Sequence, residues 1–583
     1  MSWCGGESPT PTTCSFLSFL SHPWMSAGCN SDEASRFMWN YAAWELNAFL
    51  WISLIGITSL LTQKLFKFFK LWIQARRIPG PPCSSFYGHC GLAYGERLID
   101  LLADSHKQYG SVVKLWLGPT QLLVSIKDPD LIKEILLKAK DKLPLTRKAF
   151  RLAFGLSTFF ISSFDKVQKR RDSLTNELNG RLLGGASILP TKATDCIMEK
   201  VQQMVSRGSI DSKLVSQHMA FTLLGATLFG DAFLDWSKAA LYEQLLMKIA
   251  KDACFWASYN VTPFWKQGFW RYQHLCIKLK SLTQDIVQQC RTNYKLFCCM
   301  NPSFNNQTAD VRTETVFGAP SCSGVMVQDN HSMQELNDHL NARDEPCGNI
   351  MGVMFHGCLA TAGLISNMLE RLARHPEIQD KIHLEIIMAR KCSVKGDQYN
   401  VDLMPLLLAT VYESARLLSA APLLQRCSLE HDLKLKSGLI IPAGTVLVVP
   451  VQLVHRDNSS WGNDAGKFNP YRFLSKAGKI PDLVHHGTSF AEGAEELLDH
   501  GESSFVLNHP DENAVFLSFG SGTRACVGQK FVIHAVATLF ASLLEQYEVR
   551  LQPGPKDPST IMTNSSVFQK IPSPEIVFVR RNT

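Results

Sequence analysis

The most uneven feature of the hydrophobic pattern is a stretch without charged side chains that runs from Leu46 to Gln63. Its central part, 48–61, reads AFLWISLIGITSLL and is apolar almost throughout. A helix that crosses a bilayer needs about 20 such residues, so this stretch is near the lower limit. Residues 1–43, by contrast, are rich in Ser, Thr, Pro and Gly, and we predict them to be disordered. The pattern therefore predicts a membrane-anchor helix with its flank over 44–77, and the alternatives are an interfacial helix or a buried core helix.

The charges on the two sides of this stretch are unequal. Arg36 is the one lysine or arginine before it, whereas the flank that follows is strongly basic (Lys64, Lys67, Lys70, Arg76 and Arg77). Apolar and aromatic residues separate the three lysines, so their charged ends can reach the headgroups while the rings lie at the membrane interface. By the positive-inside rule, we expect everything after the span in the cytosol.

After the anchor, a few strands are followed by many helices. The segment 109–138 predicts a strand, a turn at Gly118 and Pro119, a second strand, and a helix from about Pro129. Residues 190–290 are mainly helical by periodicity, and short strands are predicted around GLIIPAGTVLVVPV.

The C-terminal half continues the helical pattern after a gap. Residues 300–345 are polar and without periodicity, which predicts a surface loop. Helices are predicted over 349–372, 376–390 and 404–418, and a last helix follows Cys526 as far as about Gln546. The predicted fold class is mainly α with a minor β-sheet region, in one domain over 78–583.

Composition and charge mainly exclude classes of function. The chain has 583 residues, of which 45% are hydrophobic and 19% charged, and its net charge is +7. No run of lysine and arginine is long enough to indicate nucleic-acid binding, while a mildly basic face suits an acidic protein partner or an anionic membrane. The 17 cysteines show no repeated spacing, no CxxC pair and no zinc pattern. We therefore interpret all but one of them as reduced thiols in a cytosol-facing protein.

The exceptional cysteine is Cys526, in the segment FLSFGSGTRACVGQKFV. A glycine-rich turn places it just before a helix, where free backbone N–H groups and the helix dipole stabilise a thiolate. The glycines allow close approach of the backbone to a flat ligand, and Arg524 can pair with a carboxylate. These features suit any activated cysteine, including a nucleophile.

The same segment resembles the haem-binding motif of the cytochrome P450 superfamily, F-x-x-G-x-R-x-C-x-G, at all six fixed positions. The resemblance implies a P450-like fold with haem b (iron protoporphyrin IX) as cofactor. It implies that Cys526 ligates the iron, that Arg524 binds a propionate, that Phe519 packs beside the thiolate, and that Gly528 belongs to the cofactor-binding loop. The sequence around FNPYRF and in this segment is most similar to that of plant microsomal members.

Further motifs of the family have counterparts in the chain. Glu413 and Arg416 in YESARLL resemble the E-x-x-R motif, and Arg472 in FNPYRF stands where a third member of that structural triad is expected. Tyr471 replaces the glutamate that usually precedes that arginine. Arg426 matches a propionate-binding arginine after the E-x-x-R helix. Arg171 in KVQKRR fits the arginine of W-x-x-x-R, although Val167 replaces the tryptophan.

The helix expected over the distal haem face departs from the family. Its motif (A/G)-G-x-(D/E)-T aligns with residues 356–360, so Leu359 replaces the acid and Ala360 the alcohol that help to deliver protons for oxygen activation. Thr361 lies one position further, about 100° round a regular helix, and acts only if the helix is locally distorted. His356 replaces a small residue near the iron, where its imidazole could donate protons, ligate the iron or simply pack.

Three functions follow from these observations. The first is a monooxygenase in the endoplasmic reticulum membrane, which oxidises a lipophilic small molecule with O2 and electrons from NADPH-cytochrome P450 reductase. The second is a reductase-independent haem-thiolate isomerase or dehydratase that acts on a peroxide, which the replacement of the acid and alcohol favours. The third is a non-catalytic haem-binding protein with His356 and Cys526 as axial ligands. Membrane lipid is an expected partner in each case, and nucleic acid is not.

Overall fold

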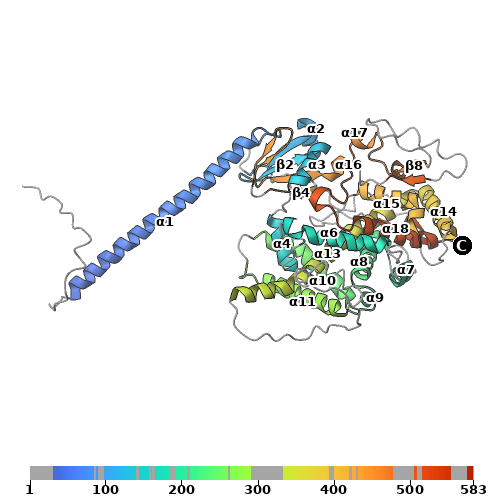
Figure 1. Cartoon of the computed structure of the whole chain (residues 1–583), viewed down its shortest axis with the longest axis horizontal. Helices are drawn as coiled ribbons and strands as arrows, with labels where there is room; N and C mark the ends of the chain where they lie inside the picture. Colours follow the sequence, from blue (N-terminus) through green and yellow to red (C-terminus); the bar gives the residue numbers. More distant parts are fainter. Residues whose placement is uncertain are drawn as a thin grey trace, which may run out of the picture. The chain divides into compact units, whose positions relative to one another are not determined.

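The chain divides into two units, Met1–Ile73 and Gln74–Thr583 (Figure 1). The computed structural model describes residues 31–83, 87–89, 97–139, 144–155, 159, 164–183, 191–205, 210–259, 263–289, 333–392, 399–418, 423–428, 431–476, 505–508, 515–552 and 574–581.

The first unit is dominated by one long helix, α1 (Ser31–Ala75). Its part from Trp39 to Ala75 is long and apolar enough to cross a membrane. Large apolar side chains such as Trp51, Ile55 and Phe66 lie exposed along it, so no protein core covers them. The helix includes 31–43, where we predicted disorder; it extends past the apolar stretch because each added residue contributes one more backbone hydrogen bond. Residues 1–30 of that prediction lie outside the described residues.

The largest sheet of the second unit has four strands in the order β1-β2-β7-β4. Strand β2 pairs parallel with β7, whereas β1 and β4 pair antiparallel with their neighbours. All residues of β2 and β7 are buried, as expected for central strands that are covered on both faces. The bounds are β1 (Val112–Trp116), β2 (Leu122–Ile126), β4 (Leu423–Arg426) and β7 (Val446–Pro450).

Three smaller sheets complete the β structure of the described residues. Their strand orders are β10-β11-β3, β5-β6 and β8-β9, and all their pairs are antiparallel. The bounds are β3 (Ile210–Asp211), β5 (Leu433–Lys434), β6 (Ile440–Ile441), β8 (Leu474–Lys476), β9 (Phe505–Leu507), β10 (Tyr547–Leu551) and β11 (Glu575–Arg580).

Helices form most of the second unit, which confirms the predicted fold class. The longer ones are α2 (Arg97–Tyr109), α3 (Pro129–Lys138), α4 (Pro144–Phe154), α6 (Phe164–Leu183), α7 (Thr191–Val205), α8 (Ser212–Phe229), α10 (Ala239–Ala257), α11 (Gln267–Gln289), α13 (Met333–Arg374), α14 (Pro376–Cys392), α15 (Pro405–Leu417) and α18 (Gln529–Gln546). Short helical turns are α9 (Asp231–Leu234), η3 (Val401–Leu403), α16 (Val451–His455), α17 (Asn458–Trp461), η4 (Pro470–Phe473) and η7 (Gly522–Arg524).

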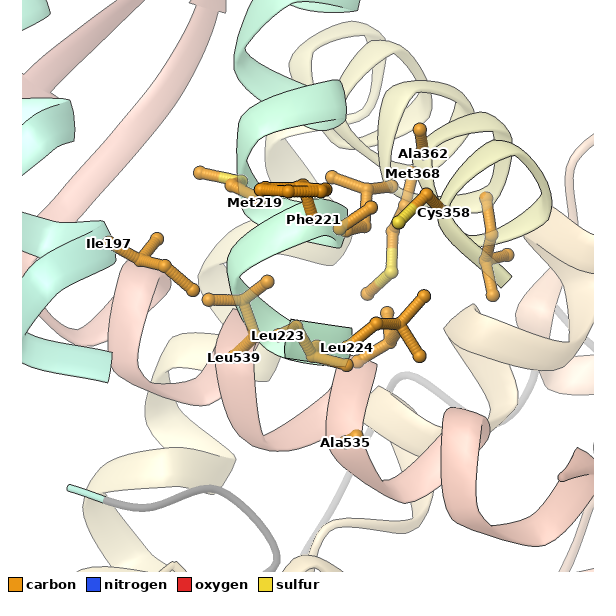
Figure 2. Packing of buried hydrophobic residues seen from close by; sticks show 14 of the residues in the cluster. Ile197, Met219, Phe221, Leu223, Leu224, Cys358, Ala362, Met368, Ala535 and Leu539 are labelled. Atoms are coloured by element: carbon orange, nitrogen blue, oxygen red, sulfur yellow. The ribbon is translucent and has the colours of Figure 1, made fainter. Parts of the chain in front are cut away.

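Helix α13 runs through the core of this unit. Its apolar segment Cys347–Arg374 is also long enough to span a membrane, but 72% of it is buried inside the protein, so it is a core helix. Figure 2 shows Phe221 and Leu224 of α8 on the side that faces Cys358 and Ala362 of α13. The two helices approach closely at Gly357, where an added Cβ would lie 2.7 Å from a methyl group of Leu224.

Most of the predicted elements are confirmed. The strand-turn-strand-helix unit is present as β1, β2 and α3, and Gly118 has the positive φ of 87° that its turn requires. The helices predicted from 349, 376 and 404 correspond to α13, α14 and α15. The surface loop predicted over 300–345 is wrong for 333–345, which begin α13; their Asn and Asp residues have low helix propensity and outweighed the helical spacing of Met333, Leu336 and Leu340 in the prediction. Residues 300–332 lie outside the described residues.

Candidate functional site

The loop that carries Cys526 folds back on itself before α18 begins. Gly520 and Gly522 have positive φ angles of 73° and 69°. A Cβ at Gly522 would lie 2.6 Å from the carbonyl oxygen of Leu136 in α3, so glycine is needed for this close approach. The backbone N–H of Cys526 donates to the carbonyl oxygen of Phe519 over 2.8 Å. These contacts place the cysteine just before the first turn of α18, as the sequence predicts.

Cys526 is accessible to solvent although protein atoms surround its thiol. Its side chain is exposed to a water-sized probe, yet burial is the main cause that raises the pKa of the thiol. An atom that is both accessible and surrounded by protein atoms lies on a concave wall. The N–H of Gly528 and the charge of Arg171 act in the opposite direction, because both stabilise the thiolate. The site therefore already contains a hydrogen-bond donor and a positive charge that stabilise a deprotonated sulfur.

Two arginines from distant segments approach this wall. Arg171 of α6 donates from Nη2 to the carbonyl oxygen of Ala525 over 2.5 Å, next to the cysteine. Arg426, the last residue of β4, is close enough to Arg171 for the two charges to interact. Burial and then the charge of Arg171 lower the pKa of Arg426 to about 10. Its Nε is buried without a hydrogen-bond partner, and no carboxylate of the described residues pairs with it.

This arrangement calls for an anionic group. Two guanidinium groups that repel each other in a poorly hydrated space are stabilised by a carboxylate between them. Haem b carries two propionates and takes a protein ligand from a single cysteine. The described residues contain no group of three or more His, Cys, Asp and Glu side chains that could hold a metal ion directly. One thiol beside two close arginines, of which Arg426 has no carboxylate partner among the described residues, thus fits a metal that is brought by a porphyrin.

The remaining residues of the predicted cofactor loop lie around the same cysteine. Arg524 is buried at the end of η7, and Phe519 is partly buried, with its ring centroid 6.3 Å from that of Phe516. Gly528 is the N-cap of α18. The structure brings all of the predicted cofactor residues, including Arg171, to one region. Val167, in place of the usual tryptophan, is fully buried one turn before Arg171.

The predicted triad forms a buried ion cluster. Glu413 and Arg416 are 0% exposed, and the guanidinium of Arg416 binds the carboxylate through two hydrogen bonds of 2.7 and 2.8 Å. Arg472 donates from Nε to Oε1 of Glu413 over 3.1 Å. Asp464, which the sequence did not single out, pairs with Arg472 over 3.0 Å. Removing one partner of a buried ion pair costs about 3–5 kcal/mol of stability, so the network stabilises the fold only while all of its charges are paired.

His455 connects this cluster to the cysteine loop, and the sequence analysis missed it. Its Nε2 accepts the N–H of Leu517 over 2.8 Å, so Nδ1 must carry the proton that it donates to the carbonyl oxygen of Arg416, also over 2.8 Å. Burial lowers the pKa of His455 to about 4, which keeps the ring neutral near pH 7. No sequence pattern could reveal this role, because it depends on two backbone groups from segments far apart in the chain.

The two distal residues predicted on α13 do not lie together. His356 is exposed, and its ring stacks on Phe150 of α4 with centroids 4.8 Å apart and an angle of 21° between the planes. Thr361 is 1% exposed. The helix is α-helical throughout this region, so Thr361 lies about 140° round the axis from His356. The local distortion that would bring Thr361 into the alcohol's place is not present.

Comparison with known proteins agrees with the geometry. The family described as Cytochrome P450 matches residues 78–578. The 11-oxo-beta-amyrin 30-oxidase of Glycyrrhiza uralensis is 25% identical over 483 residues, which cover 80% of this chain and 81% of that protein. Cytochrome P450 72A397 of Kalopanax septemlobus is 24% identical, with coverage of 80% and 81%. Cytochrome P450 4F3 of Rattus norvegicus is 23% identical, with coverage of 87% and 91%.

The neutral state of His455 predicts a pH-dependent stability. Because its pKa falls from 6.5 to about 4 on folding, its contribution is complete above pH 6.5 and is lost as the pH falls towards 4. We expect this loss to be about 3 kcal/mol. The free energy of unfolding, measured by urea denaturation from pH 4 to 7.5, should fall more steeply for the wild type than for His455→Gln. Exposed His431, replaced by Gln, is the control; parallel curves for the wild type and His455→Gln would contradict the prediction.

Proposed function

Since the chain belongs to the cytochrome P450 family, whose members are haem-thiolate monooxygenases, we propose that it inserts one oxygen atom of O2 into a lipophilic small molecule. NADPH-cytochrome P450 reductase is the proposed source of electrons. The observation that carries this proposal is the position of Cys526 beside Arg171 and Arg426, of which Arg426 has no carboxylate partner among the described residues. One ligand would bind both the thiol and the arginines: a porphyrin with propionates and a central iron.

Each residue of the site has a distinct proposed role toward haem b. The sulfur of Cys526 would bind the iron, and Arg171, Arg426 and Arg524 would meet the propionates. Phe519 would pack beside the sulfur. When bound, the haem supplies the reductive activation of O2, and electron donation from a thiolate favours cleavage of the O–O bond.

The environment of Cys526 favours the thiolate once a metal is offered. Metal binding displaces the thiol proton, so a raised pKa in the metal-free protein makes binding pH-dependent but does not prevent it. The N–H of Gly528 and the guanidinium of Arg171 then hold the negative sulfur. Both groups come from rigid elements, the first turn of α18 and helix α6, which fix the direction of the sulfur.

The substrate class is inferred from the anchor and from a relative. An exposed apolar helix, α1, keeps the protein at a membrane, where lipophilic molecules concentrate. The relative from Glycyrrhiza uralensis is named as an oxidase of 11-oxo-beta-amyrin. Both observations support an apolar substrate.

The proposed location is the endoplasmic reticulum membrane, crossed once, with the catalytic domain in the cytosol. The basic flank after the span, which includes Lys64, Lys67 and Lys70, supports this orientation because positive charge is retained on the cytosolic side.

An isomerase or dehydratase that acts on a hydroperoxide is the second candidate. The observation that favours it is α13, where Leu359 and Ala360 replace the acid and alcohol while Thr361 stays buried. A substrate that already contains an O–O bond needs neither the reductase nor those proton donors. The third candidate, a haem-binding protein without catalysis, rests on His356, whose exposed ring could serve as a second axial ligand.

Absorption spectra test the axial ligand. The reduced, carbon-monoxide-bound wild type should show the red-shifted Soret band of a thiolate–haem complex, and Cys526→Ala should lose it. Cys347→Ala, which removes a buried thiol from α13, is the control. A thiolate band that persists in Cys526→Ala would refute the ligand assignment. In the same samples, a six-coordinate ferric spectrum that reverts in His356→Ala would favour the third candidate.

Turnover assays separate the two enzymatic candidates. Purified protein with reductase and 11-oxo-beta-amyrin as a probe should consume NADPH at least about tenfold faster than the reductase alone, because electrons flow through the haem. Conversion of linoleic acid hydroperoxide without reductase or NADPH, and no NADPH consumption above background, would instead support the isomerase or dehydratase.

Protease digestion of intact microsomes tests the topology. With a tag at each end of the chain, added protease should remove the C-terminal tag and spare the N-terminal one. Protection of the C-terminal tag, with loss only after detergent is added, would contradict the proposed orientation.

A further inference from the structure

The last turn of α15 lies beside the segment that leads to Cys526. The final carbonyl groups of an α-helix have no partner inside the helix. Two of these groups in α15 accept hydrogen bonds from side chains of later segments. The hydroxyl of Ser518 donates to the carbonyl oxygen of Ala415 over 2.8 Å. Nδ1 of His455 donates to the carbonyl oxygen of Arg416, also over 2.8 Å. The end of the helix is thus bonded both to α16 and to the cysteine loop.

His455 joins this end of α15 to the cysteine loop. Its Nε2 accepts the N–H of Leu517 over 2.8 Å, while Nη1 of Arg416 donates to its carbonyl oxygen. With the bond from Nδ1 the residue makes three hydrogen bonds, and it is 0% exposed, so water cannot replace them. Loss of the ring nitrogens would leave two buried backbone groups without this partner, which costs more than the bonds themselves contribute.

Aromatic packing holds the same ring from two sides. The imidazole stacks on Phe516 with centroids 5.9 Å apart and 16° between the planes, and it meets Trp461 edge-on over 6.0 Å at 83°. These contacts do not depend on the ring nitrogens. A phenyl ring at position 455 would therefore keep most of the packing while it removes both hydrogen bonds of the imidazole. One substitution separates the two contributions.

Two backbone hydrogen bonds carry the position of this segment to the cysteine. The N–H of Gly520 donates to the carbonyl oxygen of Leu517 over 2.9 Å, which closes a turn with a φ of 73° at Gly520. Inside that turn, the carbonyl oxygen of Phe519 accepts the N–H of Cys526 over 2.8 Å. Leu517 and Ser518 come directly before Phe519 in the chain. A shift of either residue therefore displaces the carbonyl group that holds the backbone of the cysteine.

We propose that Ser518 and His455 are positioning residues that hold the cysteine loop on the end of α15 and thereby fix the direction of the Cys526 sulfur. The inference rests on the proposed haem-thiolate function and concerns residues outside the haem-binding motif. Groups behind a metal ligand orient it and strengthen its bond to the metal. Without these hydrogen bonds, the bond between sulfur and iron breaks more readily, and the released sulfur takes a proton from solvent to become a neutral thiol.

The chain offers a matched control in Thr410 of α15. Its hydroxyl donates to the carbonyl oxygen of Leu406 over 2.8 Å within the same helix, and the residue is 0% exposed. Ser518→Ala and Thr410→Val each remove one hydroxyl that is bonded to a carbonyl of α15, but only Ser518 belongs to the cysteine loop. Ser518→Thr keeps the hydroxyl and is the conservative variant. His455→Phe removes the two hydrogen bonds of the imidazole and keeps a ring.

The first measurement compares loss of the thiolate with unfolding of the full-length holoprotein. In the reduced, carbon-monoxide-bound state the red-shifted Soret band reports the thiolate, and circular dichroism reports the helices. At a fixed urea concentration below the unfolding transition, Ser518→Ala should lose the red-shifted band about fivefold faster than the wild type, and His455→Phe about tenfold faster or more, as expected for one and two lost hydrogen bonds. Thr410→Val should keep the band until the helices unfold.

The second measurement is the reduction potential of the haem in the same proteins without urea. A thiolate donates electron density to the iron and favours the ferric state, so a weaker bond to sulfur raises the potential. We expect a higher potential in Ser518→Ala and His455→Phe, and the wild-type value in Ser518→Thr and Thr410→Val. Because every protein stays folded under these conditions, a change in stability alone does not move this value.

The outcomes separate this inference from the proposed function. A thiolate band in the wild type, with an unchanged rate and potential in Ser518→Ala, would overturn the inference alone. No thiolate band in the wild type would overturn both. Loss of the band only together with the helices, in Ser518→Ala and His455→Phe alike, would show a purely structural role, which also overturns the inference. If His455→Phe does not fold, the comparison of Ser518→Ala with Ser518→Thr decides.

Discussion

The repulsion between Arg171 and Arg426 beside the Cys526 thiol is the interaction that the rest of the site has to balance. Two guanidinium groups from α6 and β4 are held close in a region where water screens charge poorly, and burial and then the charge of Arg171 lower the pKa of Arg426. An exposed pair of this kind would simply separate. Here the packing of α6 against α18 and the pairing of β4 with β7 hold the two arginines in place. An anion with two carboxylates removes the repulsion, and a porphyrin brings such an anion together with a metal for the thiol.

The buried cluster around Glu413 provides the rigidity that this balance needs. Glu413 and Arg416 on α15 tie together the loop that contains Asp464 and Arg472. His455 then links the carbonyl oxygen of Arg416 to the N–H of Leu517, at the start of the segment that leads to Cys526. Buried ions are expensive to desolvate, so their advantage lies in fixing one geometry. The position of the sulfur is therefore set by hydrogen bonds that begin on a different helix.

The distal helix combines a regular backbone with unusual side chains. Helix α13 packs closely on α8 at Gly357, and Thr361 is buried about 140° round the helix axis from the exposed His356. Neither Leu359 nor Ala360 has a side chain that can donate a proton. Glu243 on α10 lines a small pocket together with Leu359, and His356 stacks on Phe150 of α4.

The sequence by itself determined the family, the mainly helical fold, the apolar anchor and the residues of the cofactor loop. These features are local, because glycines, a cysteine and an arginine at fixed spacing within one segment produce the same turn wherever that segment folds. It also identified Glu413, Arg416 and Arg472 through two short motifs. Its errors were local too: residues 31–43 and 333–345 are helical although the polar residues among them indicated disorder and a loop.

Only the tertiary structure decided which distant groups meet. The contact of His455 with Leu517, the pairing of Asp464 with Arg472 and the position of Glu243 beside Leu359 join segments that are far apart in sequence or carry no distinctive motif. Such contacts depend on the angle and depth at which helices pack, and on the exclusion of water that changes the pKa of a carboxyl or an imidazole. Neither quantity belongs to any single segment of the chain. The sequence therefore determined the chemistry available to this protein, and the packing of α8, α10, α13 and α15 decided where each group acts.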